Sequence, residues 1–305
     1  AVMAKRLDSN STQAILSGYE IPVLGYGLYQ VPGALAEALT GQALKAGYRH
    51  IDSAAVYENE KECVSAVRAA GLKRSDVFLT TKISPQAFGY DAARQSIDES
   101  LEQAQTEYFD LILIHAPFGG KDGRLGSWRA LVEAQKAGKA RSIGVSNFGI
   151  HHLEELEEYI QNGGEGRIEV GQYELHPWLG RAELVHWLQS RGAVIEAYSP
   201  LVRGTRMNEP VLGKLSKKHQ KNPAQILLRW SIQKVSKSCP GLNLKAGVLI
   251  MKSTQGFVEL PKSATTERIQ ENINVFDFEL DEEDMRLLHT DDYSPSTWDP
   301  TVQRD

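Results

Sequence analysis

Short apolar runs rich in β-branched residues alternate with amphipathic stretches along most of the chain. Apolar runs of this kind are typical of buried strands, and a period near 3.6 residues is typical of helices. The runs predict strands near 23–27, 48–51, 77–82, 110–115, 141–145, 168–172 and 193–198, with an eighth within 247–262. Helices are predicted near 34–46, 59–70, 91–106, 127–136, 150–161, 181–190, 210–232 and 265–273. Eight such alternations favour a (β/α)8 TIM barrel over an open, doubly wound sheet.

The segment ahead of the first strand, "STQAILSGYEIPV" at 11–23, has a different pattern. Two short apolar pieces flank Ser17 and Gly18, which predicts a small β-hairpin that closes the base of the barrel. No shift in composition divides the chain, so residues 1–305 are expected to form a single barrel domain.

The region before the last helix contains one strand candidate too many. "GVLIMKST" at 247–254 and "GFVELPKSA" at 256–264 are both apolar runs followed by Lys-Ser. Either segment could supply the eighth strand and leave the other as an insertion. A duplicated strand with two alternative registers is a further interpretation.

Composition excludes several classes of protein. The 41% apolar content suffices for a large core, and the formal net charge of −5 argues against a nucleic-acid partner. The chain contains no run of about 18 apolar residues, so no membrane span is predicted, and the N-terminus lacks an apolar signal core. Cys63 and Cys239 have no metal-type spacing, so we expect reduced thiols in a cytoplasmic protein without a metal.

The chain lacks the glycine-rich phosphate loops of common nucleotide-binding domains. No G-x-G-x-x-G follows an early strand, and no G-x-x-x-x-G-K-[ST] occurs. The two glycines of "LGYGLYQVPG" at 24–33 instead suggest a close backbone approach at the barrel mouth.

Polar residues stand at the ends of the predicted strands. Asp52 ends the second strand, with Tyr57 in the loop that follows, while Lys82 and His115 end the third and fourth. Each alone has an ordinary role as a cap, a surface cation or a packed ring. Active sites of parallel barrels form at this end, so we expect the four side chains to converge.

These four residue types suit proton delivery to a carbonyl oxygen. A lysine ammonium near a tyrosine stabilises the phenolate, and a carboxylate keeps the lysine charged. An imidazole can orient the carbonyl oxygen that Tyr57 protonates, while a bound cofactor supplies a hydride to the carbon. Further along, Ser146, Asn147 and Gln172 match the polar atoms of a carboxamide, and the ring of Tyr198 could stack on a nicotinamide.

Several motifs resemble the aldo-keto reductase family. "GYRHIDSAAVYENE" at 47–60 matches G-x-R-x-x-D-[ST]-A-x-x-Y-x-N-E at every fixed position, and "GVSNF" at 144–148, "YSPL" at 198–201 and "LPKSATTERIQEN" at 260–272 match further pieces. The resemblance implies a barrel that binds NADPH without a Rossmann domain. It places the catalytic tetrad on Asp52, Tyr57, Lys82 and His115. It also assigns nicotinamide contacts to Ser146, Asn147, Gln172 and Tyr198, and pyrophosphate contacts to Ser199 and Leu201.

The resemblance also discriminates between the two eighth-strand candidates. In the family pattern the lysine precedes an arginine by six positions and an asparagine by ten, which Lys262 satisfies and Lys252 does not. The stretch at about 235–256 is then an insertion. Cofactor contacts at the adenosine end are expected from Lys262, Ser263, Arg268, Glu271 and Asn272. Two cations beside a serine suit a 2′-phosphate, which favours NADPH over NADH.

The substrate is predicted only as a class, an aliphatic or aromatic aldehyde or ketone. Candidate wall residues are Tyr29, Phe88, Phe118, Trp178 and Trp298, although each could equally serve ordinary packing. The glycine-rich "APFGGKDGRLGSW" at 116–128 predicts a short loop and an open pocket. A monomer or a weak dimer is expected.

Two other functions remain open at this point. A non-redox lyase or aldolase would use Lys82 as a Schiff base, which requires an unpaired lysine. A regulatory protein would keep the cofactor site with little turnover.

Overall fold

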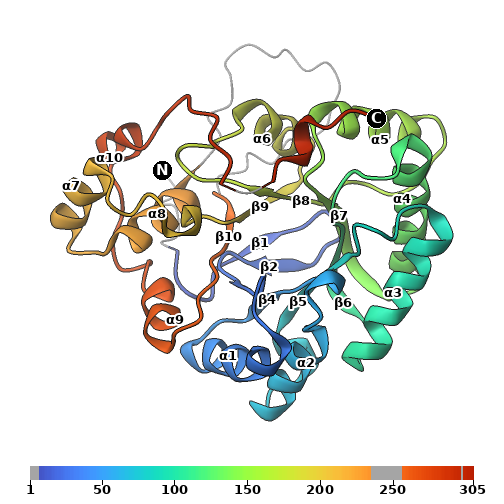
Figure 1. Ribbon diagram of the computed structural model, residues 1–305, viewed down its shortest axis with the longest axis horizontal. Coiled ribbons are helices and arrows are strands. Elements are labelled where there is room, and N and C mark those ends of the chain that lie inside the picture. Colours follow the sequence, from blue (N-terminus) through green and yellow to red (C-terminus); the bar gives the residue numbers. More distant parts are fainter. Residues whose placement is uncertain (1–6, 235–255, 297) are drawn as a thin grey trace.

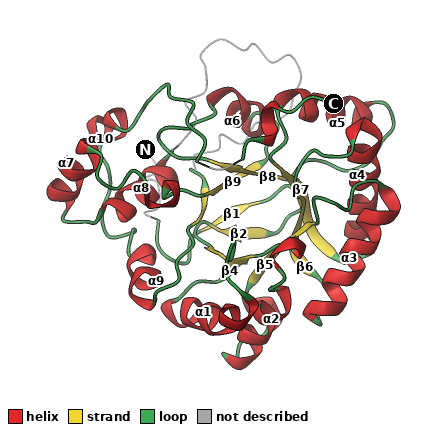
Figure 2. Ribbon diagram, viewed as in Figure 1, coloured by secondary structure: helices red, strands yellow, loops and turns green. Residues whose placement is uncertain are grey.

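The computed structural model describes residues 7–234, 256–296 and 298–305, and its centre is a parallel barrel enclosed by helices (Figures 1 and 2). Within these ranges the barrel strands are β3 (Tyr26–Gly27), β4 (His50–Asp52), β5 (Phe78–Ile83), β6 (Phe109–Ile114), β7 (Ala140–Ser146), β8 (Val170–Glu174), β9 (Val194–Tyr198) and β10 (Val258–Leu260). They pair in chain order. A parallel bridge between Leu24 and Glu259 joins the first strand region to the last, which confirms the predicted barrel.

The helices lie outside the strands, as Figure 2 shows in red. They are α1 (Gly33–Ala46), α2 (Glu60–Ala69), α3 (Tyr90–Ala104), α4 (Gly120–Lys136), α5 (Ile150–Gln161), α6 (Ala182–Gln189), α7 (Pro210–His219), α8 (Pro223–Gln233), α9 (Thr266–Ile273) and α10 (Glu282–Leu287). Short 3₁₀ turns are η1 (Ala55–Tyr57), η2 (Arg74–Asp76), η3 (Val202–Gly204) and η4 (Pro300–Val302). Outward-facing strand residues such as Ile112 and Ile143 share one core with helix residues such as Leu131 and Leu153. This layer fixes the strands that carry the site.

The predicted hairpin is present and lies at one end of the barrel. Strands β1 (Thr12–Ala14) and β2 (Glu20–Pro22) pair antiparallel, and Gly18 takes the left-handed conformation at the turn. Ile15 and Ile21 cluster with side chains from inside the barrel, namely Phe78, Leu111, Leu113, Val170, Val194 and Val258. Several of these open their strands, so the hairpin closes the N-terminal end of the barrel. The opposite end, where the strands finish, is left for a site.

The predicted helix at 210–232 is in fact two helices. Gln220 adopts the left-handed conformation after α7, and the side chain of Asn222 accepts a hydrogen bond from Gln225 N at the start of α8. Pro223 lacks an N–H and cannot continue a preceding helix. An N-cap followed by proline is therefore the signal that the hydrophobic pattern alone missed.

The loop after His115 is short, as predicted, but most of the glycine-rich stretch 116–128 is helical, because α4 already begins at Gly120. A Cβ on Gly126 would lie 2.7 Å from the backbone nitrogen of Tyr90, at the start of α3. Close packing of two helices thus requires glycine there, at a position where helix propensity alone disfavours it.

Strand β10 comes from the second Lys-Ser segment, which pairs with β9 through Val258, Glu259 and Leu260. Lys252, Cys239 and the predicted insertion, apart from Gly256, lie outside the described residues. In the ranges that the structure covers, no helix has both the length and the apolar character needed to cross a membrane.

Candidate active site

The site lies where the barrel strands end. Asp52 closes β4, Lys82 is the penultimate residue of β5, and His115 directly follows β6. Tyr57 closes η1, the turn that leads from β4 to α2. The Tyr-x-Asn-Glu motif has a local reason, since Asn59 holds this turn in place. Its amide donates to Leu28 O and Val31 O at 3.2 and 2.9 Å, and its oxygen accepts from Ser53 Oγ at 2.6 Å.

Lys82 and Asp52 form a buried ion pair. Lys82 Nζ donates to Asp52 Oδ1 at 2.6 Å and to Ser53 O at 2.8 Å, and the two side chains are only 1% and 6% exposed. Asp52 Oδ2 accepts a further hydrogen bond from Gln172 Nε2 at 2.8 Å. The lysine is therefore held charged in a place without solvent.

The phenol of Tyr57 lies between a cation and an imidazole. Lys82 Nζ is 5.1 Å from the centroid of its ring, and the ring of His115 meets it edge-on at 5.7 Å. Burial, with Asp52 and Tyr29 adding to it, raises the pKa of Tyr57 well above its ordinary value. Burial, followed by the field of Lys82, lowers the pKa of His115 to about 3. At neutral pH both Tyr57 and His115 are therefore uncharged.

A second polar cluster stands beside the tetrad. Ser146 Oγ donates to Gln172 O at 2.9 Å, and Tyr198 OH donates to Asn147 Oδ1 at 2.8 Å. Asn147 takes the left-handed conformation that asparagine tolerates, and its amide donates to His115 O at 3.0 Å. The structure thus brings all four predicted carboxamide and ring-stacking residues together next to His115.

The residues expected at the adenosine end lie around β10 and α9. Ser263 and Asn272 are buried, whereas Lys262, Arg268 and Glu271 are exposed. Tyr26 OH donates to Ser263 O at 2.6 Å and fixes the chain just before α9. Ser199 and Leu201 follow β9, and both are half-buried.

The five candidate wall residues separate into two groups. Tyr29 meets the Tyr57 ring at 5.4 Å, and Trp298 meets the rings of His115 and Phe118 at 6.2 and 5.6 Å. Trp178 is instead buried in a separate core that includes Leu212, Trp230 and Leu280. Phe88 is half exposed and covers Gly119, at the start of α4.

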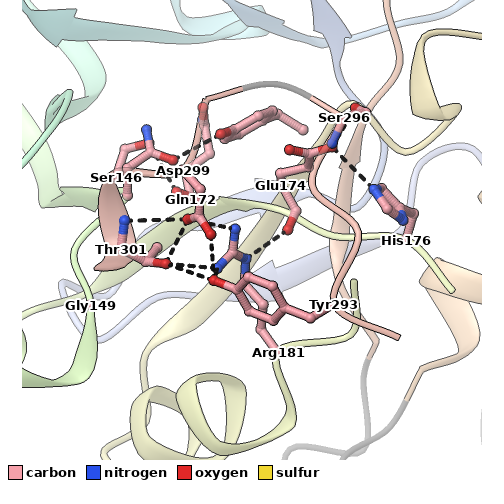
Figure 3. A network of polar contacts seen from close by, with 12 residues as sticks. Ser146, Gly149, Gln172, Glu174, His176, Arg181, Tyr293, Ser296, Asp299 and Thr301 are labelled. Atoms are coloured by element: carbon pink, nitrogen blue, oxygen red, sulfur yellow. Dashed lines mark hydrogen bonds and ion pairs between the residues drawn. The ribbon is translucent and has the colours of Figure 1, made fainter. Parts of the chain in front are cut away.

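A network of contacts that could not be predicted from the sequence holds residues 293–296 and 298–301 of the C-terminal segment (Figure 3). Arg181 donates to Thr301 Oγ1 at 2.8 Å, to Asp299 Oδ1 at 3.0 Å and to Tyr293 OH at 3.2 Å. Ser296 N donates to Glu174 Oε1 at 2.7 Å. These partners are separated by more than a hundred residues, so no local pattern could reveal them.

Together these groups can place a neutral phenol O–H and a fixed ammonium beside a bound carbonyl group. They include no metal ligand set, since the described residues contain no group of three or more His, Cys, Asp or Glu that could hold an ion.

Known proteins of one family resemble this chain in sequence and in fold. The model of the Aldo/keto reductase family matches residues 23–290. A glyoxal reductase of Bacillus subtilis is 38% identical over 275 residues, covering 90% of this chain and 90% of that protein. A 9,11-endoperoxide prostaglandin H2 reductase of Trypanosoma cruzi is 38% identical over 272 residues, covering 88% and 87%. The crystal structure of an aldo/keto reductase from Brucella melitensis superposes with a TM-score of 0.80 at 37% identity, covering 91% of this chain and 98% of that one.

Proposed function

Since the chain belongs to the aldo/keto reductase family, we propose that it reduces an aldehyde or ketone to the alcohol with NADPH as hydride donor. One observation carries this proposal. The ring centroid of Tyr57, the candidate proton donor, lies 5.1 Å from Lys82 Nζ at the barrel mouth, beside a neutral His115. This arrangement suits a reaction in which a carbonyl group accepts a hydride at its carbon and a proton at its oxygen.

The residues of the second cluster fit a nicotinamide. Both hydrogens of Gln172 Nε2 are taken by Asp52 and Glu196. Its Oε1 has no hydrogen-bond partner in the described part of the chain and can accept from a carboxamide N–H. The half-buried ring of Tyr198 offers a flat face for the nicotinamide, and the bound cofactor would supply the hydride.

Tyr57 would deliver the proton. Its raised pKa keeps the O–H intact at neutral pH, and His115, uncharged for the same reason of burial, can hydrogen-bond the substrate carbonyl oxygen. When the O–H bond of Tyr57 breaks, a phenolate remains, and the charge of Lys82 stabilises it until solvent returns a proton. Asp52 keeps Lys82 charged throughout.

The preference for NADPH rests on two exposed cations. Lys262 follows β10 and Arg268 lies in the first turn of α9, so both can pair with a 2′-phosphate at that helix N-terminus. We further infer a single barrel domain acting as a monomer or weak dimer in the cytoplasm.

The two alternative functions find less support. A Schiff-base lysine must be neutral and unpaired, whereas Lys82 is bound to Asp52 at 2.6 Å. A regulatory protein with little turnover has no need of the complete tetrad.

The test is NADPH oxidation, followed by loss of nicotinamide absorbance, with a panel of aldehydes and ketones. Glyoxal belongs in that panel, because the Bacillus subtilis relative is a glyoxal reductase. Tyr57→Phe should lower kcat by about 10²- to 10⁴-fold while cofactor binding survives. Tyr19→Phe, an exposed tyrosine on the hairpin at the other end of the barrel, serves as control. Equal turnover by Tyr57→Phe and wild type would overturn the role of Tyr57, and an inactive wild type across the panel would overturn the function.

A further inference from the structure

An acidic residue stands inside the barrel where the strand pattern calls for an apolar one. Glu196 is the third residue of β9, and both it and the neighbouring His50 of β4 are completely buried. Burial of two ionisable groups costs free energy unless they are paired and hydrogen-bonded. Neither takes part in the reaction proposed above.

Glu196 shares a hydrogen-bond donor with the tetrad. Gln172 Nε2 donates to Asp52 Oδ2 at 2.8 Å and to Glu196 Oε2 at 3.0 Å. If the amide were rotated by half a turn, Gln172 Oε1 would face the carboxylate of Asp52, which is repulsive, and both hydrogen bonds donated by Nε2 would be lost. The two acids together therefore fix which end of this amide is presented to the nicotinamide.

The opposite side of Glu196 faces His50. Glu196 Oε1 is 3.4 Å from His50 Nε2, and that nitrogen is also 3.2 Å from Thr80 Oγ1. The other charged groups near Glu196 are Asp52 and Lys82, from β4 and β5. Burial, followed by the charge of Asp52, raises the pKa of Glu196 to about 8, and burial lowers the pKa of His50 to about 4. At neutral pH Glu196 is thus protonated and His50 is uncharged.

We propose that Glu196 is a positioning residue for the reaction: its carboxyl group orients the amide of Gln172 toward the nicotinamide carboxamide, and in its protonated form it adds no negative charge beside Asp52, the ion-pair partner of Lys82. This inference rests on the proposed function. Glu196 acts through Gln172 and Lys82 and touches neither the cofactor nor the substrate.

The proposal has a consequence for pH dependence. Loss of the Glu196 proton, above about pH 8, places a further negative charge near Lys82. That charge offsets the field with which Lys82 stabilises the Tyr57 phenolate, so proton delivery slows. The kcat for carbonyl reduction should therefore fall above about pH 8, well before Tyr57 itself ionises.

Two variants separate the roles of Glu196. Glu196→Gln has no carboxyl proton to lose. Its kcat at about pH 10, divided by its kcat at about pH 7, should therefore be several-fold higher than the same ratio for the wild type. Glu196→Met removes the acceptor of Gln172, and binding of NADP⁺, read by tryptophan fluorescence, should weaken about tenfold. Binding of 2′-phospho-ADP-ribose, which lacks the nicotinamide, should not change. Glu259→Gln is the matched control. Glu259 is also a fully buried acid, but it is hydrogen-bonded to Ser231 and not to Gln172, so this variant should keep the wild-type pH profile.

A third readout needs neither cofactor nor substrate. The infrared carbonyl absorption of protonated carboxylic acids should lose one component in the wild-type protein between about pH 6 and about pH 10, on either side of the Glu196 pKa. Glu196→Gln should lack this change. An unaltered pH profile in Glu196→Gln, or equal loss of affinity for both ligands in Glu196→Met, would overturn the proposal. Failure of the wild type to reduce any carbonyl would overturn the proposed function alone, because the infrared band and ligand binding still report on Glu196.

Discussion

The buried pair of Lys82 and Asp52 supports a stability prediction that needs no substrate. At 2.6 Å, two unit charges attract by about 6 kcal/mol at an effective dielectric constant of about 20. The cost of removing both from water offsets most of that gain. Loss of one partner, however, leaves the other charge buried, so Asp52→Asn and Lys82→Met should each lower the free energy of unfolding by about 3–5 kcal/mol.

The double variant Asp52→Asn/Lys82→Met carries neither charge. It should therefore be destabilised by much less than the sum of the single variants, with a coupling energy of at least about 2 kcal/mol. Equilibrium urea unfolding, followed by circular dichroism and by tryptophan fluorescence, measures all four free energies. The two signals must give coincident transitions for the comparison to hold.

A surface pair of the same length serves as control. Lys139 Nζ lies 2.6 Å from Asp98 Oδ1, with side chains 39% and 51% exposed. The cycle of Lys139→Met and Asp98→Asn should give a coupling energy under about 1 kcal/mol. If the Lys82 and Asp52 variants proved additive to within about 0.5 kcal/mol, like distant sites, the assignment of a desolvated pair that keeps Lys82 charged would be refuted.

Two further predictions concern ligands. Arg268→Ala should weaken NADPH binding about 10- to 100-fold and NADH binding hardly at all, because only NADPH carries a 2′-phosphate. Gln270→Ala, at an exposed position of the same helix, is the control. Equal weakening of NADPH and NADH binding by Arg268→Ala would refute the pairing of Arg268 with the 2′-phosphate. Arg181→Ala should release the C-terminal segment and raise KM for the carbonyl substrate about tenfold, since Trp298 loses its place beside His115. Arg181→Lys keeps the charge without the planar guanidinium, so its KM should lie between those of the wild type and Arg181→Ala. An unchanged KM in Arg181→Ala would show that the segment does not line the substrate pocket.

The barrel and the meeting of Asp52, Lys82 and His115 could be predicted because their signals are local. Each residue ends an apolar run, and parallel strands that close into a barrel bring such ends together. The Lys-Ser ambiguity was resolved by the family resemblance, through the spacing from Lys262 to Arg268 and Asn272, the last two of which lie in α9.

Other features depend on contacts that no local pattern contains. The link from Asp52 through Gln172 to Glu196 joins β4, β8 and β9, and requires knowing which residues face inward at equal height in the barrel. A signal was present, since Glu196 interrupts the apolar run "AVIEAY" at 193–198. An acid in a buried strand demands a partner, and only the folded barrel identifies it.

The central claim is that a hydride and a proton reach the two ends of one carbonyl bond at this site. The most direct measurement uses NADPH deuterated at the transferred position, an aldehyde of the active panel, and mass spectrometry of the alcohol. We predict one deuterium on the former carbonyl carbon of the product from the wild type, and almost no labelled alcohol from Tyr57→Phe. An alcohol without deuterium on that carbon, or equal labelled product from both proteins, would contradict the account.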